Sequence, residues 1–118
     1  MQQMSKLMIV LIGVILSGCA MQTSVGVESQ PTGAKIFHAG VNDPEVVPLP
    51  SNLGNGQQAV TDSNMVLNWR RMQHDAKVLV EWPDGTRSQA AVIPMHSNAC
   101  TVMFKKGEVP VITEYKQP

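Results

Sequence analysis

Apolar and polar residues alternate along most of the chain with the period of two that is typical of half-buried β-strands. Val25 and Val27, for example, alternate with Gly26 and Glu28. Similar alternation or short apolar runs occur at 34–38, 65–70, 77–82, 88–93, 100–106 and 109–115. These segments recur at roughly 10-residue spacing, which is typical of all-β folds. The pattern therefore predicts an all-β domain, a small β-sandwich of about seven short antiparallel strands.

The clearest local signal is a β-hairpin at 77–93. Val78, Val80 and Trp82 fall on one face of the first strand, and Pro83-Asp84-Gly85 follows directly. Proline fixes φ, aspartate bonds to the turn backbone and glycine adopts positive φ, so this tripeptide indicates a tight turn.

Residues 40–56 interrupt the strand pattern. They contain Pro44, Pro48, Pro50, Gly54 and Gly56. We expect a long loop here with a short edge strand at 45–47, because proline in a sheet is confined to edges. Loops of this length are uncommon unless they are functional or disordered. A single helical turn fits at 70–75.

The first eighteen residues follow a different pattern. A polar start with one positive charge, Lys6, precedes the apolar run 7–16 and the small residues Ser17 and Gly18. The run is about ten residues long, whereas a membrane-spanning helix needs roughly 20. Residues 1–18 therefore have the features of a cleaved signal peptide.

The end of this leader, Leu16-Ser17-Gly18-Cys19, resembles the lipobox of bacterial lipoproteins. The resemblance implies cleavage between Gly18 and Cys19, a diacylglycerol thioether on Cys19 and acylation of its new amino group by a fatty acid such as palmitate. It also implies export to the outer membrane of a Gram-negative bacterium, because Ala20 rather than Asp follows the cysteine. The domain would face the periplasm, with the inner membrane and the cell surface as alternatives.

Cleavage defines the remaining organisation: the lipidated Cys19 and a short tether at 19–24, then a domain at 25–118. The full chain has nine Lys and Arg residues and nine Asp and Glu residues. Removal of the leader removes Lys6, so the net charge of the remaining chain is about −1. Neither nucleic acid nor an anionic membrane surface is indicated as a partner by this balance. Cys100 is left without a partner in the chain, and we expect it to be a small buried hydrophobe rather than a reactive thiol.

Residues 25–40 resemble the opening of a PEGA domain, in which a strand leads into a Ser-x-Pro-x-Gly-Ala turn and a second strand. The matching positions are Ser29, Pro31, Gly33, Ala34 and Gly40. The resemblance implies a small β-sandwich, related in shape to transthyretin-like modules, of a kind found in envelope proteins beside a membrane anchor and without known catalysis. The chain departs from the family by inserting the loop at 41–56, and its Trp82-Pro83-Asp84-Gly85 matches a later family turn only loosely.

Residues with catalytic or metal-binding chemistry are few. His38, His74 and His96 are widely spaced and lack metal-ligand spacing, so no metal or cofactor is expected. His96 and Cys100 are four residues apart, which on an extended strand separates their Cα atoms by about 13 Å. Neither spacing predicts an enzyme.

Three functions are compatible with these residues. The first, which we favour, is a non-catalytic structural or protein-interaction module, anchored to the membrane by lipid and docking on another envelope protein through an edge strand or the Pro-rich loop. The second is a glycan- or peptidoglycan-binding lipoprotein with Trp69, Arg70 and Arg71 as ligand contacts; a solvated strand end is the plainer interpretation of that run. The third is a small periplasmic inhibitor or enzyme centred on Cys100.

Overall fold

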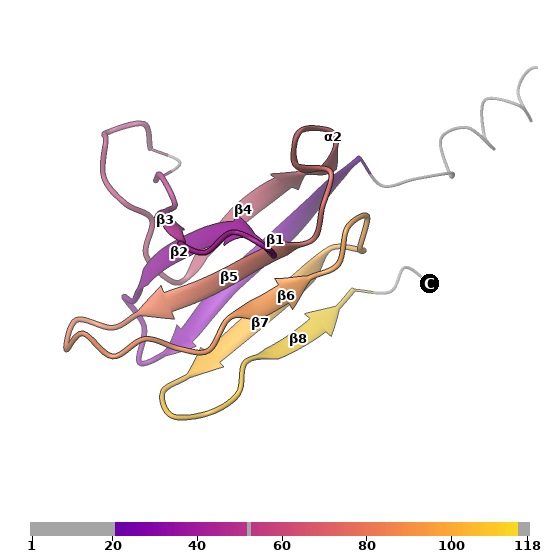
Figure 1. Ribbon diagram of the computed structural model, residues 1–118. Coiled ribbons are helices and arrows are strands. Elements are labelled where there is room, and N and C mark those ends of the chain that lie inside the picture. Colours follow the sequence, from indigo (N-terminus) through magenta and orange to yellow (C-terminus); the bar gives the residue numbers. More distant parts are fainter. Residues whose placement is uncertain (1–20, 52, 116–118) are drawn as a thin grey trace, which may run out of the picture.

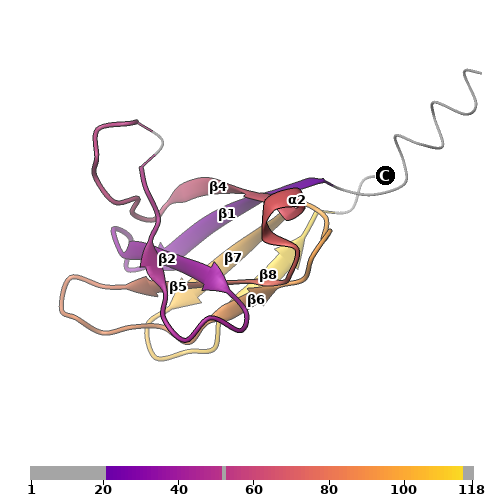
Figure 2. The same ribbon diagram turned by 45° about the horizontal axis from the view of Figure 1, so that its top comes forward.

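In the computed structural model, which describes residues 21–51 and 53–115, two four-stranded sheets pack face to face (Figures 1 and 2). Sheet A has the strand order β4-β1-β7-β8 and sheet B the order β3-β2-β5-β6. The elements are β1 (Gln22–Gln30), β2 (Lys35–Gly40), β3 (Val47–Pro48), β4 (Ser63–Asn68), the one-turn helix α2 (Trp69–Met72), β5 (Ala76–Glu81), β6 (Ala91–Ile93), β7 (Cys100–Lys105) and β8 (Val111–Glu114). The predicted all-β sandwich is confirmed.

One strand pair differs from the predicted antiparallel arrangement. β1 and β7 pair in parallel, with Val25 opposite Cys100 and Phe104 opposite Ser29. All other neighbours in both sheets are antiparallel. Parallel pairing needs a long crossover rather than a hairpin, and here the whole of sheet B lies between the two strands in the sequence. The sheet is therefore mixed.

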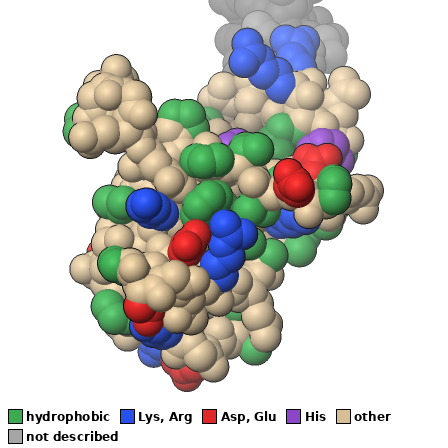
Figure 3. Space-filling view, turned by 60° about the vertical axis from the view of Figure 1, so that its left-hand side comes forward, with side chains coloured by type: hydrophobic (Ala, Val, Ile, Leu, Met, Phe, Trp, Pro, Cys, Tyr) green, Lys and Arg blue, Asp and Glu red, His purple; other side chains and the backbone are tan. Residues whose placement is uncertain are grey.

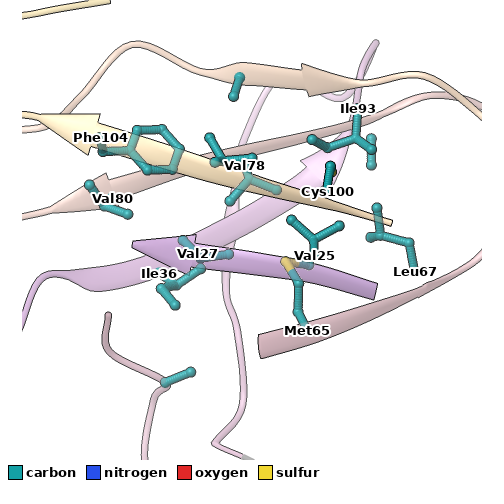
Figure 4. Close-up of a cluster of buried hydrophobic side chains, with 14 of the residues drawn as sticks. Val25, Val27, Ile36, Met65, Leu67, Val78, Val80, Ile93, Cys100 and Phe104 are labelled. Carbon is teal, nitrogen blue, oxygen red and sulfur yellow. The ribbon is translucent and has the colours of Figure 1, made fainter. Parts of the chain in front are cut away.

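The core lies between the two sheets and is filled by the inward positions of the alternating segments (Figure 4). Val25 and Val27 of β1 face Val78 and Val80 of β5, and all four are fully buried. The predicted faces of β1, β4 and β5 are confirmed. Full burial of each such side chain contributes roughly 1.5–3 kcal/mol to folding, so this core is the main source of stability.

The beginning of β1 differs from the sequence prediction. Residues 19–24 were expected to form a tether, but Gln22, Thr23 and Ser24 pair with β4 as part of β1. The Thr23 side chain is buried. These residues are polar, so the apolar alternation does not extend over them. A buried hydroxyl group is compatible with a core only when it has hydrogen-bond partners, and those partners are not visible in the sequence.

The predicted turns and loops are found close to their expected places. The hairpin after β5 is closed by hydrogen bonds from Gly85 N–H to Trp82 O and from Trp82 N–H to Thr86 O, both 2.9 Å. The Pro-rich segment is a long loop that projects from the sandwich (Figure 1), interrupted by β3 at the edge of sheet B. The helical turn begins at Trp69, one residue earlier than predicted.

The Ser-x-Pro-x-Gly-Ala turn between β1 and β2 is held by a buried chain of hydroxyl groups. Ser29 Oγ donates to the Pro31 carbonyl at 2.6 Å, so the hydrogen of the 2.5 Å contact between Ser29 Oγ and Thr61 Oγ1 comes from Thr61. Thr61 Oγ1 then accepts from the Ala34 N–H at 3.1 Å. The indole of Trp82 also donates to the Pro31 carbonyl, at 2.9 Å. Thr61 thus closes the turn from the bend that directly precedes β4.

Gly33 within this turn has φ +83°, a conformation that other L-residues rarely adopt. The glycine of the motif is therefore required by the backbone, and its serine by the buried hydroxyl chain.

Replacement of Thr61 by valine is expected to lower the free energy of unfolding by about 1–3 kcal/mol, because Ala34 N–H and Ser29 Oγ each lose a buried partner at nearly constant side-chain volume. Urea denaturation followed by fluorescence measures the change. Thr32→Val in the same turn is the matched control; Thr32 is exposed, and its replacement should change stability by no more than about 0.5 kcal/mol. Equal effects of the two substitutions would contradict a structural role for the hydroxyl chain.

Candidate functional site

The three histidines do not converge on a metal site. Among the described residues, no group of three or more His, Cys, Asp and Glu side chains is arranged to hold a metal ion. His38 on β2 is half-buried, and desolvation lowers its pKa. His96 packs against Trp69, with ring centroids 6.3 Å apart. His38 and His74 both line the groove described below, whereas His96 lies against Trp69.

Cys100 at the start of β7 is 1% exposed and forms no disulfide. Burial, and secondarily the charge of Glu114, raise the pKa of its thiol. Catalytic cysteines need the opposite shift, because the thiolate is the nucleophile. The structure bears out the prediction of a small buried hydrophobe.

Trp69 is not available to bind a ligand, which corrects the sequence prediction. Its side chain is 1% exposed and belongs to the hydrophobic core. The alternation of Met65, Leu67 and Trp69 indicates this burial. The ligand hypothesis came from the two arginines that follow Trp69 and not from this alternation. Its ring cannot provide a stacking surface for a sugar.

The buried Trp69 anchors one end of the sandwich through the hydroxyl group of Thr23. The indole N–H donates to Thr23 Oγ1 at 2.7 Å, and Thr23 Oγ1 donates to the Ser97 carbonyl at 2.6 Å. The backbone N–H of Trp69 donates to the Met21 carbonyl at 3.0 Å. The start of β1, α2 and the β6–β7 loop are thus connected at the same end, which we call the α2 end (Figure 1).

Arg70 and Arg71 lie on the surface of the α2 end but on different sides of the helix. Both are exposed. Arg70 lines a shallow hollow of about 350 Å³ together with Met21, Gln22 and Asn68. Arg71 lines a separate groove between the edges of the two sheets. The structure therefore does not bring the predicted trio of Trp69, Arg70 and Arg71 together as one ligand site.

The groove beside Arg71 opens between β3 and β4 and has a volume of about 480 Å³. Its lining includes Leu49, Met65 and Leu67, with His38 and His74 also at its surface. Gly40 forms part of the wall, and a Cβ atom added there would meet the His74 ring at 2.4 Å. A glycine at this position is thus required for the close approach of His74 to β2.

The opposite edge of sheet A, strand β8, is a second exposed feature. It is the last strand of its sheet and pairs only with β7. Four large apolar residues in and beside it are exposed: Val109, Val111, Ile112 and Tyr115. By contrast, β4 at the other edge of sheet A combines Val66 with the polar residues Ser63, Asn64 and Asn68. Sheet A therefore has one apolar edge and one mainly polar edge.

The backbone of β8 has hydrogen-bonding groups that point away from the sheet. The Tyr115 N–H donates to the Ala99 carbonyl at 2.8 Å, across to the chain that leads into β7. Because alternate residues of an antiparallel strand turn their N–H and C=O groups to opposite sides, those of Ile112 and Glu114 point outward. Such an edge is a template for another strand.

The comparisons with known proteins identify no relative. No protein-family model matches the chain, and no curated protein or solved structure matches it. Among the residues that the structure describes, no helix is long and apolar enough to cross a membrane. Gly18 and Cys19 lie outside those residues. The lipobox and PEGA resemblances therefore remain predictions.

Proposed function

We propose that the chain is a lipid-anchored envelope protein whose β-sandwich is a non-catalytic protein-interaction module. The anchor is Cys19 in the outer membrane of a Gram-negative bacterium, and the domain faces the periplasm. The observation that carries the interaction role is the exposed apolar edge of β8, with four large apolar side chains and outward backbone groups. The lipobox at Leu16-Ser17-Gly18-Cys19 supports the anchor.

The partner is proposed to be an extended apolar segment of another envelope protein, added as a strand beside β8. Backbone hydrogen bonds to Ile112 and Glu114 would supply affinity, and contacts with Val109 and Val111 would supply specificity, as in other cases of strand addition. Exposed apolar edges are otherwise a liability for aggregation. A partner strand would remove that liability.

The glycan-binding alternative has weaker support than it has from the sequence alone. Carbohydrate sites use exposed aromatic faces, whereas Trp69 is buried and Arg70 and Arg71 line separate hollows. An enzyme centred on Cys100 is disfavoured because that side chain is 1% exposed, and its burial raises the pKa of the thiol.

A photo-crosslinking amino acid in place of Val111 is expected to give one discrete adduct with an envelope protein in intact cells. The matched control is the same replacement of Val66, on the other edge strand of sheet A. The two valines are 61% and 60% exposed, and both lie at outward positions of their strands. Gel electrophoresis and mass spectrometry identify the adduct. Equal adducts from both positions, or none from position 111, would contradict docking at β8.

Cys19→Ser is expected to abolish incorporation of labelled palmitate and to leave the protein unprocessed or released from the membrane fraction. Cys100→Ser is the matched control and should keep both label and membrane association, because its thiol is buried in the fold. Labelling and fractionation after cell lysis measure the two properties. Unchanged labelling of the Cys19→Ser variant would rule out this anchor.

A further inference from the structure

We propose that the α2 end of the sandwich rests on the bilayer that holds the anchor, with Arg70 and Arg71 contacting the phosphate groups of anionic phospholipids. This inference depends on the lipid attachment at Cys19 proposed above. It adds a second membrane contact and a fixed orientation, neither of which follows from the anchor alone.

The first argument is the short distance between Cys19 and α2. Consecutive Cα atoms are 3.8 Å apart, so Met21 lies no more than about 8 Å from Cys19. The Met21 carbonyl accepts a hydrogen bond from the backbone N–H of Trp69, the first residue of α2. The helix is therefore attached to the chain two residues after the lipid-bearing position. If the acyl chains are in the bilayer, α2 lies at its surface.

The second argument is that α2 cannot move away from this position independently. The Trp69 indole and the Ser97 carbonyl are both bonded to the buried hydroxyl of Thr23. Moving α2 would leave buried polar groups without partners, which costs about 1–3 kcal/mol for each group. The fold thus keeps the arginines beside the start of β1.

The third argument is the charge of the α2 end. Arg70 and Arg71 are exposed, and neither forms an ion pair with another described residue. Figure 3 shows basic side chains at this end of the molecule, as well as elsewhere on the same face. Arginine binds phosphate through parallel N–H donors, which makes a phospholipid headgroup a fitting ligand.

The nearby carboxylates do not neutralise the two arginines directly. Asp75 Oδ1 accepts from the backbone N–H of Met95 at 2.8 Å, and Asp43 Oδ2 accepts from that of Gly40 at 2.9 Å. Glu114 is exposed at the α2 end of β8, next to Tyr115, and is separated from α2 by the width of sheet A, because β8 and β4 form opposite edges.

Exposed apolar side chains at the same end fit the same partner. Met21, Met95 and Tyr115 are all exposed there. Amphipathic and apolar side chains beside basic residues are typical of surfaces that lie in the headgroup region. A soluble anion would contact only the arginines, whereas a bilayer surface would contact both the arginines and the exposed apolar side chains.

The test uses the full lipidated protein purified from membranes and reconstituted in vesicles. A fluorophore is attached at Asn98→Cys, in the β6–β7 loop of the α2 end, and its quenching by headgroup-labelled lipid is measured. In vesicles of phosphatidylcholine that also contain phosphatidylglycerol, whose anionic headgroups make the surface potential negative, strong quenching is expected. Glu108→Cys, in the turn at the other end of β7, should be quenched weakly.

Combined Arg70→Gln and Arg71→Gln substitution should lower the ratio of docked to undocked domains on the order of 30-fold, because each juxtamembrane basic residue contributes about 1 kcal/mol. The helix cap should survive, since Asn68 accepts from the backbone of Arg70 and not from its side chain. Combined Arg87→Gln and Lys105→Gln substitution removes the same charge from the other end and should leave quenching at position 98 unchanged.

The outcomes separate this inference from the proposed function. Quenching at position 98 that is absent, or unaffected by loss of Arg70 and Arg71, would overturn the inference while leaving the anchor intact. Equal quenching in vesicles of phosphatidylcholine alone would also overturn it, because the contact would not depend on anionic lipid. Protein that fails to remain with the vesicles would overturn the anchor itself.

Discussion

The hydroxyl group of Thr23 is the contact on which the arrangement of the α2 end depends. It accepts a hydrogen bond from the Trp69 indole and donates one to the Ser97 carbonyl, so both of its capacities are used. Three segments that are distant in the sequence are joined by this one buried group. Because an unpaired polar group in the core is costly, the three segments have one stable arrangement, and the exposed side chains of α2 are presented from a fixed position.

A second buried hydroxyl chain acts at the other end of the same strand. Ser29 is near the end of β1 and is connected through Thr61 to the backbone of Ala34. β1 is therefore held at both ends by buried polar contacts and along its length by β4 and β7. The strand that follows the proposed anchor is thus one of the two inner strands of sheet A.

Much of the fold could be predicted from alternation alone, because Val25, Val27, Val78 and Val80 pack one face of each strand into the core. The burial of Thr23 could not, since its partners, Trp69 and Ser97, are more than 40 residues away. The parallel pairing of β1 with β7 is likewise non-local. Trp69 was a candidate ligand contact in the glycan-binding alternative because of its arginine neighbours, although its position in the alternating segment indicates the core.

The β8 edge and the α2 end show why candidate sites were harder to predict than strands. The apolar pattern at 109–115 predicts a strand, but only the sheet order reveals that β8 has no neighbour on one side. In a chain of balanced charge, two adjacent arginines do not by themselves predict a membrane contact. The contact is suggested only by the fold, which places them beside the first residues of β1. Both the docking edge at β8 and the membrane contact at the α2 end therefore depend on which segments are neighbours in the folded structure.

The central claim is that Cys19 is the first residue of the mature protein and carries lipid. Mass spectrometry of the N-terminal peptide of protein purified from membranes tests it directly. The account predicts a peptide that begins at Cys19 and carries a diacylglyceryl group on sulfur and an acyl group on nitrogen. A chain that still begins at Met1, or an unmodified Cys19, would contradict it.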